Sequence, residues 1–233
     1  MKTIVAVLCA GISAIALLSS CEPASEAEAR SAGRIEYEVT FPFNKEDMLV
    51  NLYPQKMQIA FSDDRMKAEL KSFGGVIATE FFVDNDDKQF TQLLRAFNER
   101  LALNLDQSGV DGMLATMPSM KLTATEDVDT IAGYLCSRTI AEFRSDSVPA
   151  IDLWHTGEIS ISSPNWWNQF NGCEELLLGY DIEQFGMRMR LRATSVYFCT
   201  IPDDEFELPE NYDAIEWPEM EKKLGGLIDQ FSE

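Results

Sequence analysis

Histidine, basic residues and phosphate-binding loops are scarce in this 233-residue chain. The only histidine is His155, so the sequence predicts neither a zinc site built on several histidines nor a cysteine nucleophile with a choice of bases. Lys and Arg number 19 against 39 Asp and Glu, which gives a formal net charge of −20 at pH 7. This balance excludes nucleic acid as an expected partner, because binding a polyanion requires many basic groups. Gly74 and Gly75 precede no Lys-Ser or Lys-Thr pair and are interpreted as a turn. We therefore expect no catalytic residue, metal ion or cofactor.

Long apolar runs are also lacking, apart from one at the amino terminus. Residues 1–20 join a positive charge at Lys2 to an apolar run of about fifteen residues, which is shorter than the ~20 residues that cross a bilayer as a helix. We predict that this segment is a signal peptide. Its end, Leu18-Ser19-Ser20-Cys21, resembles the lipobox of bacterial lipoproteins, in which cleavage precedes the cysteine and acyl chains are attached to it. Acylation of Cys21 is therefore predicted, and the alternative is an ordinary secretory signal in which Cys21 stays unmodified.

The segment after the predicted cleavage site is interpreted as a tether. Residues 21–33 begin at Cys21, are rich in Ala, Glu and Ser, and contain no bulky apolar side chain, which is typical of a flexible acidic linker. The lipobox implies a bacterial cell-envelope protein whose acyl chains hold it on a membrane. We predict the outer membrane, facing the periplasm, with the cell surface as the alternative location.

Cysteine is scarce in the rest of the chain. Cys9 leaves with the signal peptide and Cys21 is acylated, so Cys136, Cys173 and Cys199 remain. In an oxidising compartment we expect one disulfide among these three residues and one spare thiol. The sequence does not choose among the three pairings.

Residues 34–233 are predicted to form a single domain made mainly of strands. Apolar residues alternate with polar ones at Ile35, Tyr37 and Val39, which is typical of a strand with one buried face. Residues 84–88 are predicted to be the turn of a hairpin. Similar patterns predict further strands at 57–61, 66–70, 81–83, 90–94, 101–105, 121–125, 133–143, 151–156, 176–178, 180–185 and 187–198. The expected fold is mainly β (α+β): a curled antiparallel sheet or half-barrel of about nine to eleven strands covered by one or two helices.

Two other segments break the strand pattern. Residues 107–119 contain two glycines and one proline and are predicted to be a loop. At the carboxyl end, Pro218 is followed by apolar residues at helical spacing, which predicts a C-terminal helix. These residues are Met220, Leu224, Leu227, Ile228 and Phe231. We expect the helix to close one side of the sheet, and the alternative is a movable lid over a cavity.

Aromatic residues gather in one polar loop. Trp166, Trp167 and Phe170 lie within residues 162–172. Such side chains are candidates for contact with a ligand, a lipid surface or a partner protein. The alternative is that they pack inward and plug one end of the sheet.

An arginine row is the other candidate site. Arg188, Arg190 and Arg192 alternate with Met187 and Met189, so one strand presents its arginines on a single face, about 6.5 Å apart. One interpretation is a site for an anionic ligand or lipid headgroup. The other is a ladder of ion pairs with carboxylates on neighbouring strands. The two methionines, on the opposite face, are candidates for lining a ligand cavity or for core packing.

Three stretches occur in an order that resembles a group of envelope families. They are TEDVDTIAGYLC (125–136), DLWHTGEI (152–159) and FELPENY (206–212). Together they resemble the GLPGLI-type and related envelope domains of unknown function, in which I-x-G-Y/F-x-C is followed by W-Y/H-T-x-x-I and the chain closes with F-x-L/I-P-x-x-Y. The resemblance covers residues 34–215. Residues 171–179 depart from the GLPGLI stretch, which indicates a neighbouring family.

These families are similar to LolA-like proteins, so the resemblance implies a half-barrel whose concave face takes acyl chains or apolar peptide segments. The leading hypothesis is a lipid-anchored envelope protein that binds a hydrophobic ligand, a lipid or a lipoprotein acyl chain, inside the curled sheet. Its rival is an anchored module that binds another envelope protein and carries no small ligand. An enzyme is the third hypothesis. A wide apolar cavity would favour the first, and a filled core with exposed aromatic residues the second.

Overall fold

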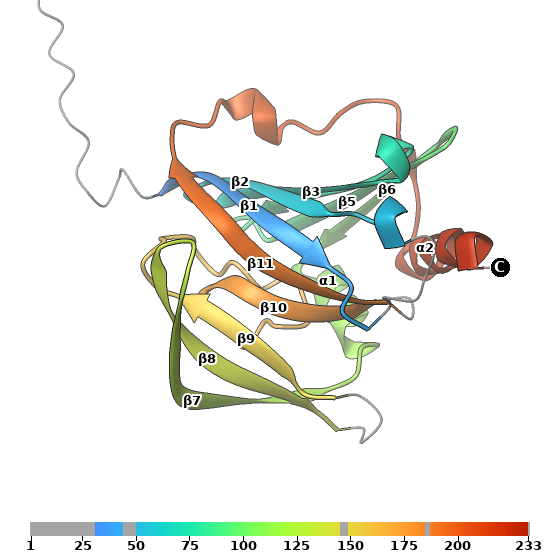
Figure 1. The fold of residues 1–233 in the computed structure, drawn as a ribbon. Helices are drawn as coiled ribbons and strands as arrows, with labels where there is room; N and C mark the ends of the chain where they lie inside the picture. The colour runs from blue at the N-terminus through green and yellow to red at the C-terminus, as the bar shows by residue number, and fades with distance from the viewer. Residues whose placement is uncertain (1–30, 44–49, 145–148, 185–186, 233) are drawn as a thin grey trace, which may run out of the picture.

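The computed structural model describes residues 31–43, 50–144, 149–184 and 187–232. The predicted signal peptide, Cys21 and the first part of the predicted tether lie outside these residues. The described residues form a 12-stranded, unclosed, curled sheet with two α-helices (Figure 1). This arrangement confirms the predicted fold class, including the half-barrel shape.

The strands follow one another as a long meander with two exceptions, because β6 and β7, and likewise β11 and β12, are not neighbours in the sheet. The strands are β1 (Ala32–Thr40), β2 (Lys56–Ser62), β3 (Arg65–Ser72), β4 (Ile77–Asp84), β5 (Gln89–Ala96), β6 (Glu99–Asp106), β7 (Met120–Ile131), β8 (Tyr134–Phe143), β9 (Ile151–Thr156), β10 (Leu176–Gln184), β11 (Met187–Phe198) and β12 (Asp213–Ala214). The helices are α1 (Gln107–Ala115) and α2 (Trp217–Ser232), with short 3-10 turns η2 (Val50–Leu52), η3 (Phe73–Gly75) and η4 (Asp203–Phe206). The sheet order is β12-β6-β5-β4-β3-β2-β1-β11-β10-β9-β8-β7. The first strand therefore lies in the middle of the sheet, between β2 and β11.

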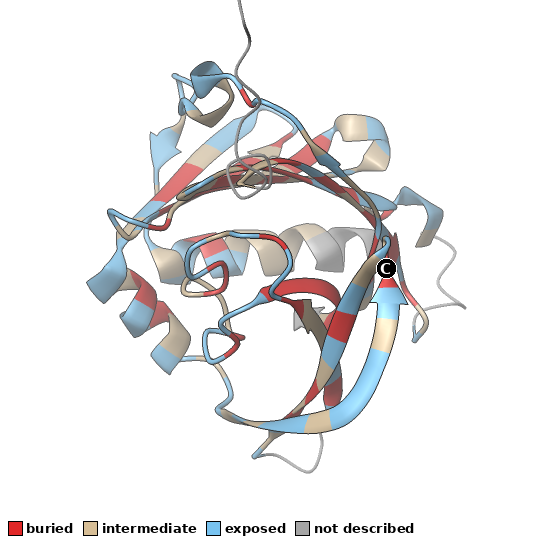
Figure 2. Ribbon diagram, turned by 90° about the vertical axis from the view of Figure 1, so that its left-hand side faces the viewer, coloured by how far each residue is buried: buried red, intermediate tan, exposed pale blue. Residues whose placement is uncertain are grey.

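The sheet curls because most of its strands have only one apolar face to bury. In Figure 1, β2 to β6 lie above and β7 to β9 below, with β1, β11 and β10 between them. The adjacent strands pair antiparallel, except that the two-residue β12 pairs in parallel with β6. Helix α2 lies at one end of the curl (Figure 1). Figure 2, viewed from the side, shows buried residues spaced along the strands of the curved sheet.

Strand β1 shows how the sequence pattern sets the buried face. Ile35, Tyr37 and Val39 are 0%, 1% and 1% exposed, and they alternate with more exposed residues as predicted. The Tyr37 hydroxyl donates to the carbonyl oxygen of Leu177 at 2.8 Å and so ties β1 to β10. Burial raises the pKa of Tyr37 well above its ordinary value, so the phenol stays protonated and remains a donor.

Helix α1 corrects the prediction of a loop at residues 107–119. The carboxylate of Asp106 accepts a hydrogen bond from the Gly109 amide at 2.8 Å and caps the helix. Val110 and Met113, 0% and 5% exposed, pack into the core beneath the sheet. Two glycines make the intrinsic helix propensity weak, so burial of these apolar residues decides the structure.

The predicted hairpin turn at residues 84–88 is confirmed. A side-chain oxygen of Asp84 accepts hydrogen bonds from the backbone amides of Asp86 and Asp87 at 3.1 and 2.8 Å. These bonds form the turn that joins β4 to β5.

The predicted C-terminal helix is also confirmed. Met220 is 0% exposed, and the partly buried Leu224 and Leu227 pack against the same core. The predicted contributions of Ile228 and Phe231 fall outside the described side chains. In the part of the chain that is described, no helix is both long and apolar enough to cross a membrane.

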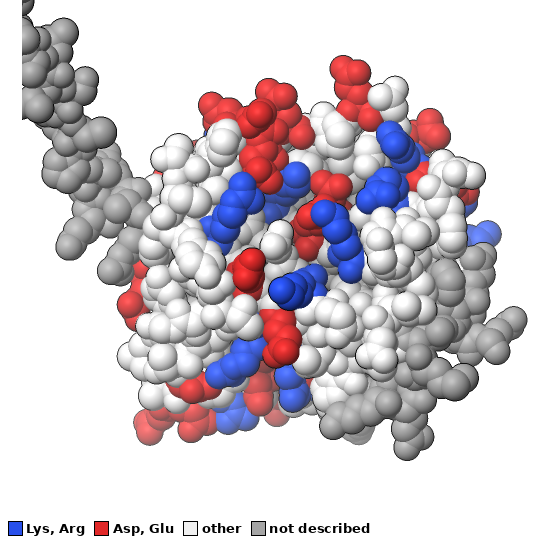
Figure 3. All heavy atoms as spheres, turned by 45° about the horizontal axis from the view of Figure 1, so that its top comes forward, with Lys and Arg blue, Asp and Glu red and all other residues white. Residues whose placement is uncertain are grey.

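Residues 199–216, here called the outer strap, connect β11 to α2 across the outer side of β2 to β6. Ion pairs hold its first part: Arg65 contacts Asp203 at 2.7 Å and Arg34 contacts Glu205 at 2.9 Å. Further along, Tyr212 packs on a small cluster that contains Phe82. Figure 3 shows acidic and basic side chains interspersed on this face.

We expect Glu205 to make the stability of the domain depend on pH. The hydrogen bond from Arg34 holds the pKa of Glu205 below its ordinary value of 4.5. Because the folded pKa is lowered, the pair stabilises the domain above pH 4.5, and this contribution is lost as the pH falls through the folded pKa. The pair is partly exposed, so Glu205→Gln should cost only about 0.2–1 kcal/mol at neutral pH.

Urea unfolding at about pH 7, 5, 4 and 3 checks this expectation. Glu205→Gln should lie below the wild type at neutral pH and converge with it in acid. The control is Glu207→Gln, since Glu207 is exposed on the same strap and forms no ion pair among the described residues. A constant difference between wild type and Glu205→Gln across this range would contradict the prediction.

Candidate functional site

Residues 157–175, here called the inner loop, connect β9 to β10 and fill the concave side of the sheet. The Trp167 ring lies 5.5 Å from the ring of Phe81 on β4 and 5.3 Å from that of Phe90 on β5, measured between centroids. The indole nitrogen of Trp167 donates to the carbonyl of Pro164 at 3.0 Å. Trp167 therefore packs inward against the opposite half of the sheet.

The other two aromatic candidates of the inner loop also contact the protein itself. Trp166 donates from its indole nitrogen to the side-chain oxygen of Asn85 at 3.0 Å, and the Lys88 ammonium lies 5.2 Å from its ring centre. Phe170 is 1% exposed and packs edge-on against Tyr180 with 5.7 Å between ring centres. The inner loop thus acts as a plug, as one of the two sequence interpretations predicted.

The arginine row lies on β11 and is organised by one buried carboxylate. Asp181 of β10 has an 8% exposed side chain and accepts from Arg188 at 3.1 Å and from Arg190 at 2.8 Å. Its hydrogen bond to Asp181 raises the pKa of Arg190 above the ordinary value. The Arg188 side chain is 11% exposed, whereas those of Arg190 and Arg192 are 51% and 47% exposed. Arg188 and Asp181 therefore form a buried ion pair, and the guanidiniums of Arg190 and Arg192 reach toward solvent.

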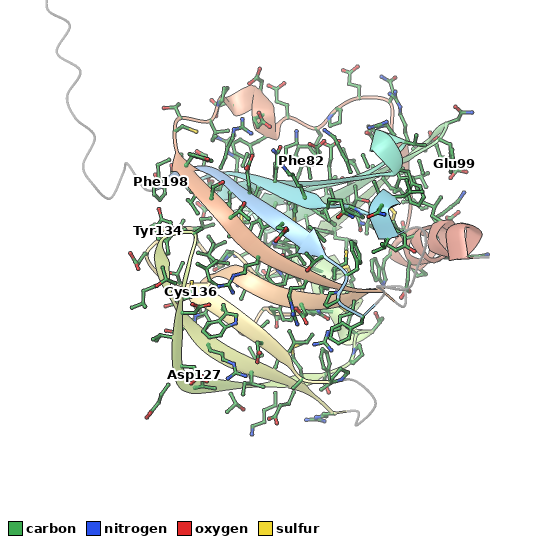
Figure 4. All side chains as sticks on the ribbon, in the orientation of Figure 1. Phe82, Glu99, Asp127, Tyr134, Cys136 and Phe198 are labelled. Atoms are coloured by element: carbon green, nitrogen blue, oxygen red, sulfur yellow. The ribbon has the colours of Figure 1, made fainter. Side chains whose placement is uncertain are left out.

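The tip of the β7–β8 hairpin leans against the end of β11. Strands β10 and β11 pair only from Gly179 opposite Arg192 to Gln184 opposite Met187, and the hairpin tip lies beside the remainder of β11. Asp129 accepts from Arg192 at 2.6 Å, and this hydrogen bond lowers the pKa of Asp129. In Figure 4, Tyr134 at the hairpin tip and Phe198 at the end of β11 lie at the same end of the molecule, and their ring centres are 6.5 Å apart.

The arginine row faces a cavity of about 380 Å³, here called the arginine cavity. It is lined by Ala150, Asp152, Trp154, Gly179, Tyr180, Asp181, Arg188, Arg190, Leu191 and Arg192. Asp152 of β9 accepts from Arg138 of β8 at 2.7 Å, and the Arg138 guanidinium lies 6.0 Å from the ring centre of Trp154. The predicted arginine ladder and a candidate ligand site thus coincide in one place.

Met189 of β11 does not line this cavity. Met189 is partly buried and packs against the main core. Met187 begins β11, and its side chain falls outside the description. The arginine cavity is therefore bounded by the polar face of β11, opposite the face that holds Met189.

His155 is paired within the sheet. Its Nδ1 lies 2.6 Å from a carboxylate oxygen of Glu175, and its Nε2 lies 2.9 Å from the hydroxyl of Thr139. Both ring nitrogens thus have a partner, and the pair links β8, β9 and the end of the inner loop. Among the described residues, no group of three or more His, Cys, Asp or Glu side chains is placed to hold a metal ion.

The predicted disulfide is corrected by the structure, in which Cys136, Cys173 and Cys199 are free thiols. Cys136 is 0% exposed in the main core, whereas Cys173 is 7% exposed in a second cluster with Phe170. Cys199 is exposed where β11 ends. The three thiols lie in separate environments, which the spacing along the sequence did not reveal.

We expect one of these three thiols to react rapidly with a maleimide. Burial raises the pKa of Cys136 to about 11 and also raises the pKa of Cys173, so neither forms the reactive thiolate near neutral pH. Cys199 should label first, and Cys199→Ser should remove the fast phase, as read by mass spectrometry of residues 22–233. In urea without reductant, the maleimide should label all three thiols. If it labels only one thiol under these conditions, the other two form a disulfide.

The arginines were predicted as candidate site residues, but their partners were not. Asp181, Asp152 and Trp154 were not candidates, although all three line the cavity. Asp181 alternates with Tyr180 and Ile182, which places it on the polar face of its strand. This alternation was the one sequence signal that could have identified Asp181 as a partner of the arginines. The register of β9, β10 and β11, which puts Trp154, Gly179 and Arg192 in one row, cannot be read from a single chain.

Comparisons with known proteins give distant structural matches. No protein-family model and no curated protein matches the chain. A crystal structure of MucB has 11% sequence identity and a TM-score of 0.32, over 79% of this chain and 60% of that chain. The MucA/MucB complex of Pseudomonas aeruginosa has 11% identity and a TM-score of 0.32, over 78% of this chain and 58% of that chain. A β-barrel-like protein of the domain of unknown function DUF1849 from Brucella abortus has 8% identity and a TM-score of 0.34, over 73% of this chain and 98% of that chain. The chain thus spans about 60% of the length of the MucB structure that it matches.

Proposed function

We propose that this chain is a non-catalytic binding domain of the bacterial cell envelope, whose ligand occupies the arginine cavity. The observation that supports this proposal is that one side of the sheet is filled by the protein itself, whereas the other side has an open cavity. The inner loop occupies the concave side, and a cavity of about 380 Å³ lies on the polar face of β9 to β11. This volume is at the small end of the range for ligand sites.

The predicted anchor completes the proposal. Acylation of Cys21 would hold the domain on the outer membrane, facing the periplasm, through the acidic tether that leads into β1. The resemblance of residues 18–21 to a lipobox supports this location. The anchored domain would then sample polar molecules close to the membrane surface.

The hydrophobic-ligand hypothesis requires a different state of the inner loop. An acyl chain on the concave side would take the place of Trp167 against Phe81 and Phe90. It would also have to compensate for the exposure of Phe170, which is 1% exposed. We therefore place the ligand in the arginine cavity, and we treat a bound lipid as an outcome that the experiment must separate.

Native mass spectrometry of residues 22–233, purified from bacterial periplasm, tests the proposal. This piece contains all the described residues. We expect a small polar adduct on the wild type that is lost from the double variant Arg190→Gln, Arg192→Gln. The matched control is Arg100→Gln, because Arg100 is an exposed arginine of β6, on the other half of the sheet.

Three results would overturn the proposal. A lipid found by solvent extraction and kept by the double variant would return the ligand to the concave side. A clean apo mass, together with unchanged melting of wild type in periplasmic extract, would leave a partner-binding module as the function. An adduct lost equally from Arg100→Gln would show that nonspecific charge holds it.

A further inference from the structure

The arginine cavity combines local positive charge with an acidic chain. Three arginines and two aspartates line it, whereas the chain as a whole carries a formal net charge of −20. Asp181 is already bound by Arg188 and Arg190, and Asp152 is bound by Arg138. The charge left to attract a ligand is therefore that of the partly exposed guanidiniums.

Arg190 and Arg192 are held in place but still have donors to offer. Asp181 takes the Nε hydrogen and one terminal hydrogen of Arg190, and Asp129 takes one terminal hydrogen of Arg192. A guanidinium has five N–H groups, so each side chain keeps further donors that bond to no acceptor among the described residues. Because the carboxylates fix both side chains, little side-chain entropy remains to be lost on binding.

The spacing of these two arginines suits an oxyanion. They are two residues apart on β11, and Leu191 between them is 2% exposed and faces the core. Alternate residues of a strand lie about 6.5 Å apart on one face, which lets two planar guanidiniums approach one carboxylate or phosphate. A single lysine would provide only a point charge, whereas paired guanidiniums select for oxyanion geometry.

Trp154 and Asp152 provide the remainder of the site. Trp154 is opposite Gly179, which is opposite Arg192, so the three form a row across the sheet. A Cβ atom at Gly179 would lie 3.1 Å from Ile131 and 3.4 Å from Trp154, so Gly179 leaves room for Ile131 and lies in van der Waals range of the Trp154 side chain. One carboxylate oxygen of Asp152 binds Arg138, and the other is available to accept from a hydroxyl group.

We infer that the arginine cavity binds a small hydroxylated molecule that carries a carboxylate or phosphate, such as an acidic sugar. Arg190 and Arg192 hold the oxyanion, the face of Trp154 packs against the body of the ligand, and Asp152 accepts from a hydroxyl. The inference rests on the proposed function and names the ligand class of the same site. The chemistry of the cavity is shared by free acidic sugars and by phosphate-bearing headgroups.

Isothermal titration of the full chain tests this inference, with the protein expressed with its own leader and purified from the envelope in a mild detergent. The probes are glucuronate, glucose 6-phosphate, glucose and inorganic phosphate. We expect both acidic sugars to bind, glucose not to bind at about 10 mM, and inorganic phosphate to bind at least about tenfold more weakly than the acidic sugars. Added salt should weaken the binding of both acidic sugars.

Variants assign the roles of the side chains. Arg190→Gln and Arg192→Gln should each weaken acidic-sugar binding about tenfold or more. Trp154→Leu should weaken acidic sugars but leave the binding of inorganic phosphate unchanged. Arg100→Gln should bind like the wild type, and thermal melting of each variant establishes that it is folded. Displacement of glucose 6-phosphate by phosphatidylglycerol vesicles would identify a headgroup as the source of the oxyanion, and its absence a free solute.

Several outcomes would overturn the inference. They are equal binding of glucose and glucuronate, unchanged binding in both folded arginine variants, and absence of binding by either acidic sugar. If a polar adduct nevertheless disappears from the double arginine variant in native mass spectrometry, the proposed function stands and only the ligand class is wrong. If neither experiment finds a ligand, both proposals fail.

Discussion

Phe170→Ala is expected to lower the free energy of unfolding by about 3–5 kcal/mol, because the substitution leaves a cavity in a closed apolar cluster. Phe170 is 1% exposed and packs with Leu153 and Leu177, which are 0% and 4% exposed. Its ring also meets Tyr180 edge-on at 5.7 Å. Loss of this ring should loosen the inner loop from β8 to β10.

Urea unfolding followed by tryptophan fluorescence measures this effect, because Trp166 and Trp167 are in the same loop. Phe170→Leu should cost less than Phe170→Ala, since it restores part of the lost volume. The control is Leu135→Ala, because Leu135 is 59% exposed and its truncation should change stability little. A loss below about 1 kcal/mol for Phe170→Ala would show that the inner loop is not fixed by this residue.

The strands were predictable because burial on one face leaves a period of two in the sequence. The predicted ranges 151–156 and 187–198 coincide with β9 and β11. The alternation at Ile35, Tyr37 and Val39 placed β1 correctly for the same reason. The C-terminal helix was predictable from the helical spacing around Met220.

The other features of the structure could not be predicted because they depend on contacts between residues that are far apart in the sequence. Helix α1 has two glycines, and its existence depends on the burial of Val110 and Met113, although Asp106 was a usable capping signal. The arginine cavity needs β9, β10 and β11 in one register, which a local pattern does not specify. The plug formed by Trp167 depends on Phe81 and Phe90, which lie much earlier in the chain.

Asp181→Asn is the second substitution for which we expect a large loss, about 3–5 kcal/mol in the free energy of unfolding. The Asp181 side chain is 8% exposed and binds Arg188, which is 11% exposed. Asparagine keeps the shape but removes the negative charge, so a buried guanidinium would remain without its counter-ion. Urea unfolding at neutral pH measures the loss.

Two comparisons make this prediction specific. Asp129→Asn breaks the pair with Arg192, in which both side chains are more than 40% exposed, and should change stability much less. Arg188→Met with Asp181→Leu should recover part of the stability, because an apolar pair leaves no buried charge. If Asp181→Asn is as stable as the wild type, Asp181 does not organise the arginine row.

The position of β1 in the middle of the sheet limits the order in which the sheet can be completed as the chain is synthesised. Hairpin contacts between successive strands can form β2 to β6 and β7 to β10 as each segment emerges, whereas β1 gains its second neighbour only when β11 is present. Until then β1 and β10 each present an unpaired edge that invites association with other chains. We therefore expect the two halves to join late in folding, and a chain truncated before Met187 would lack the β1–β11 pairing that connects them.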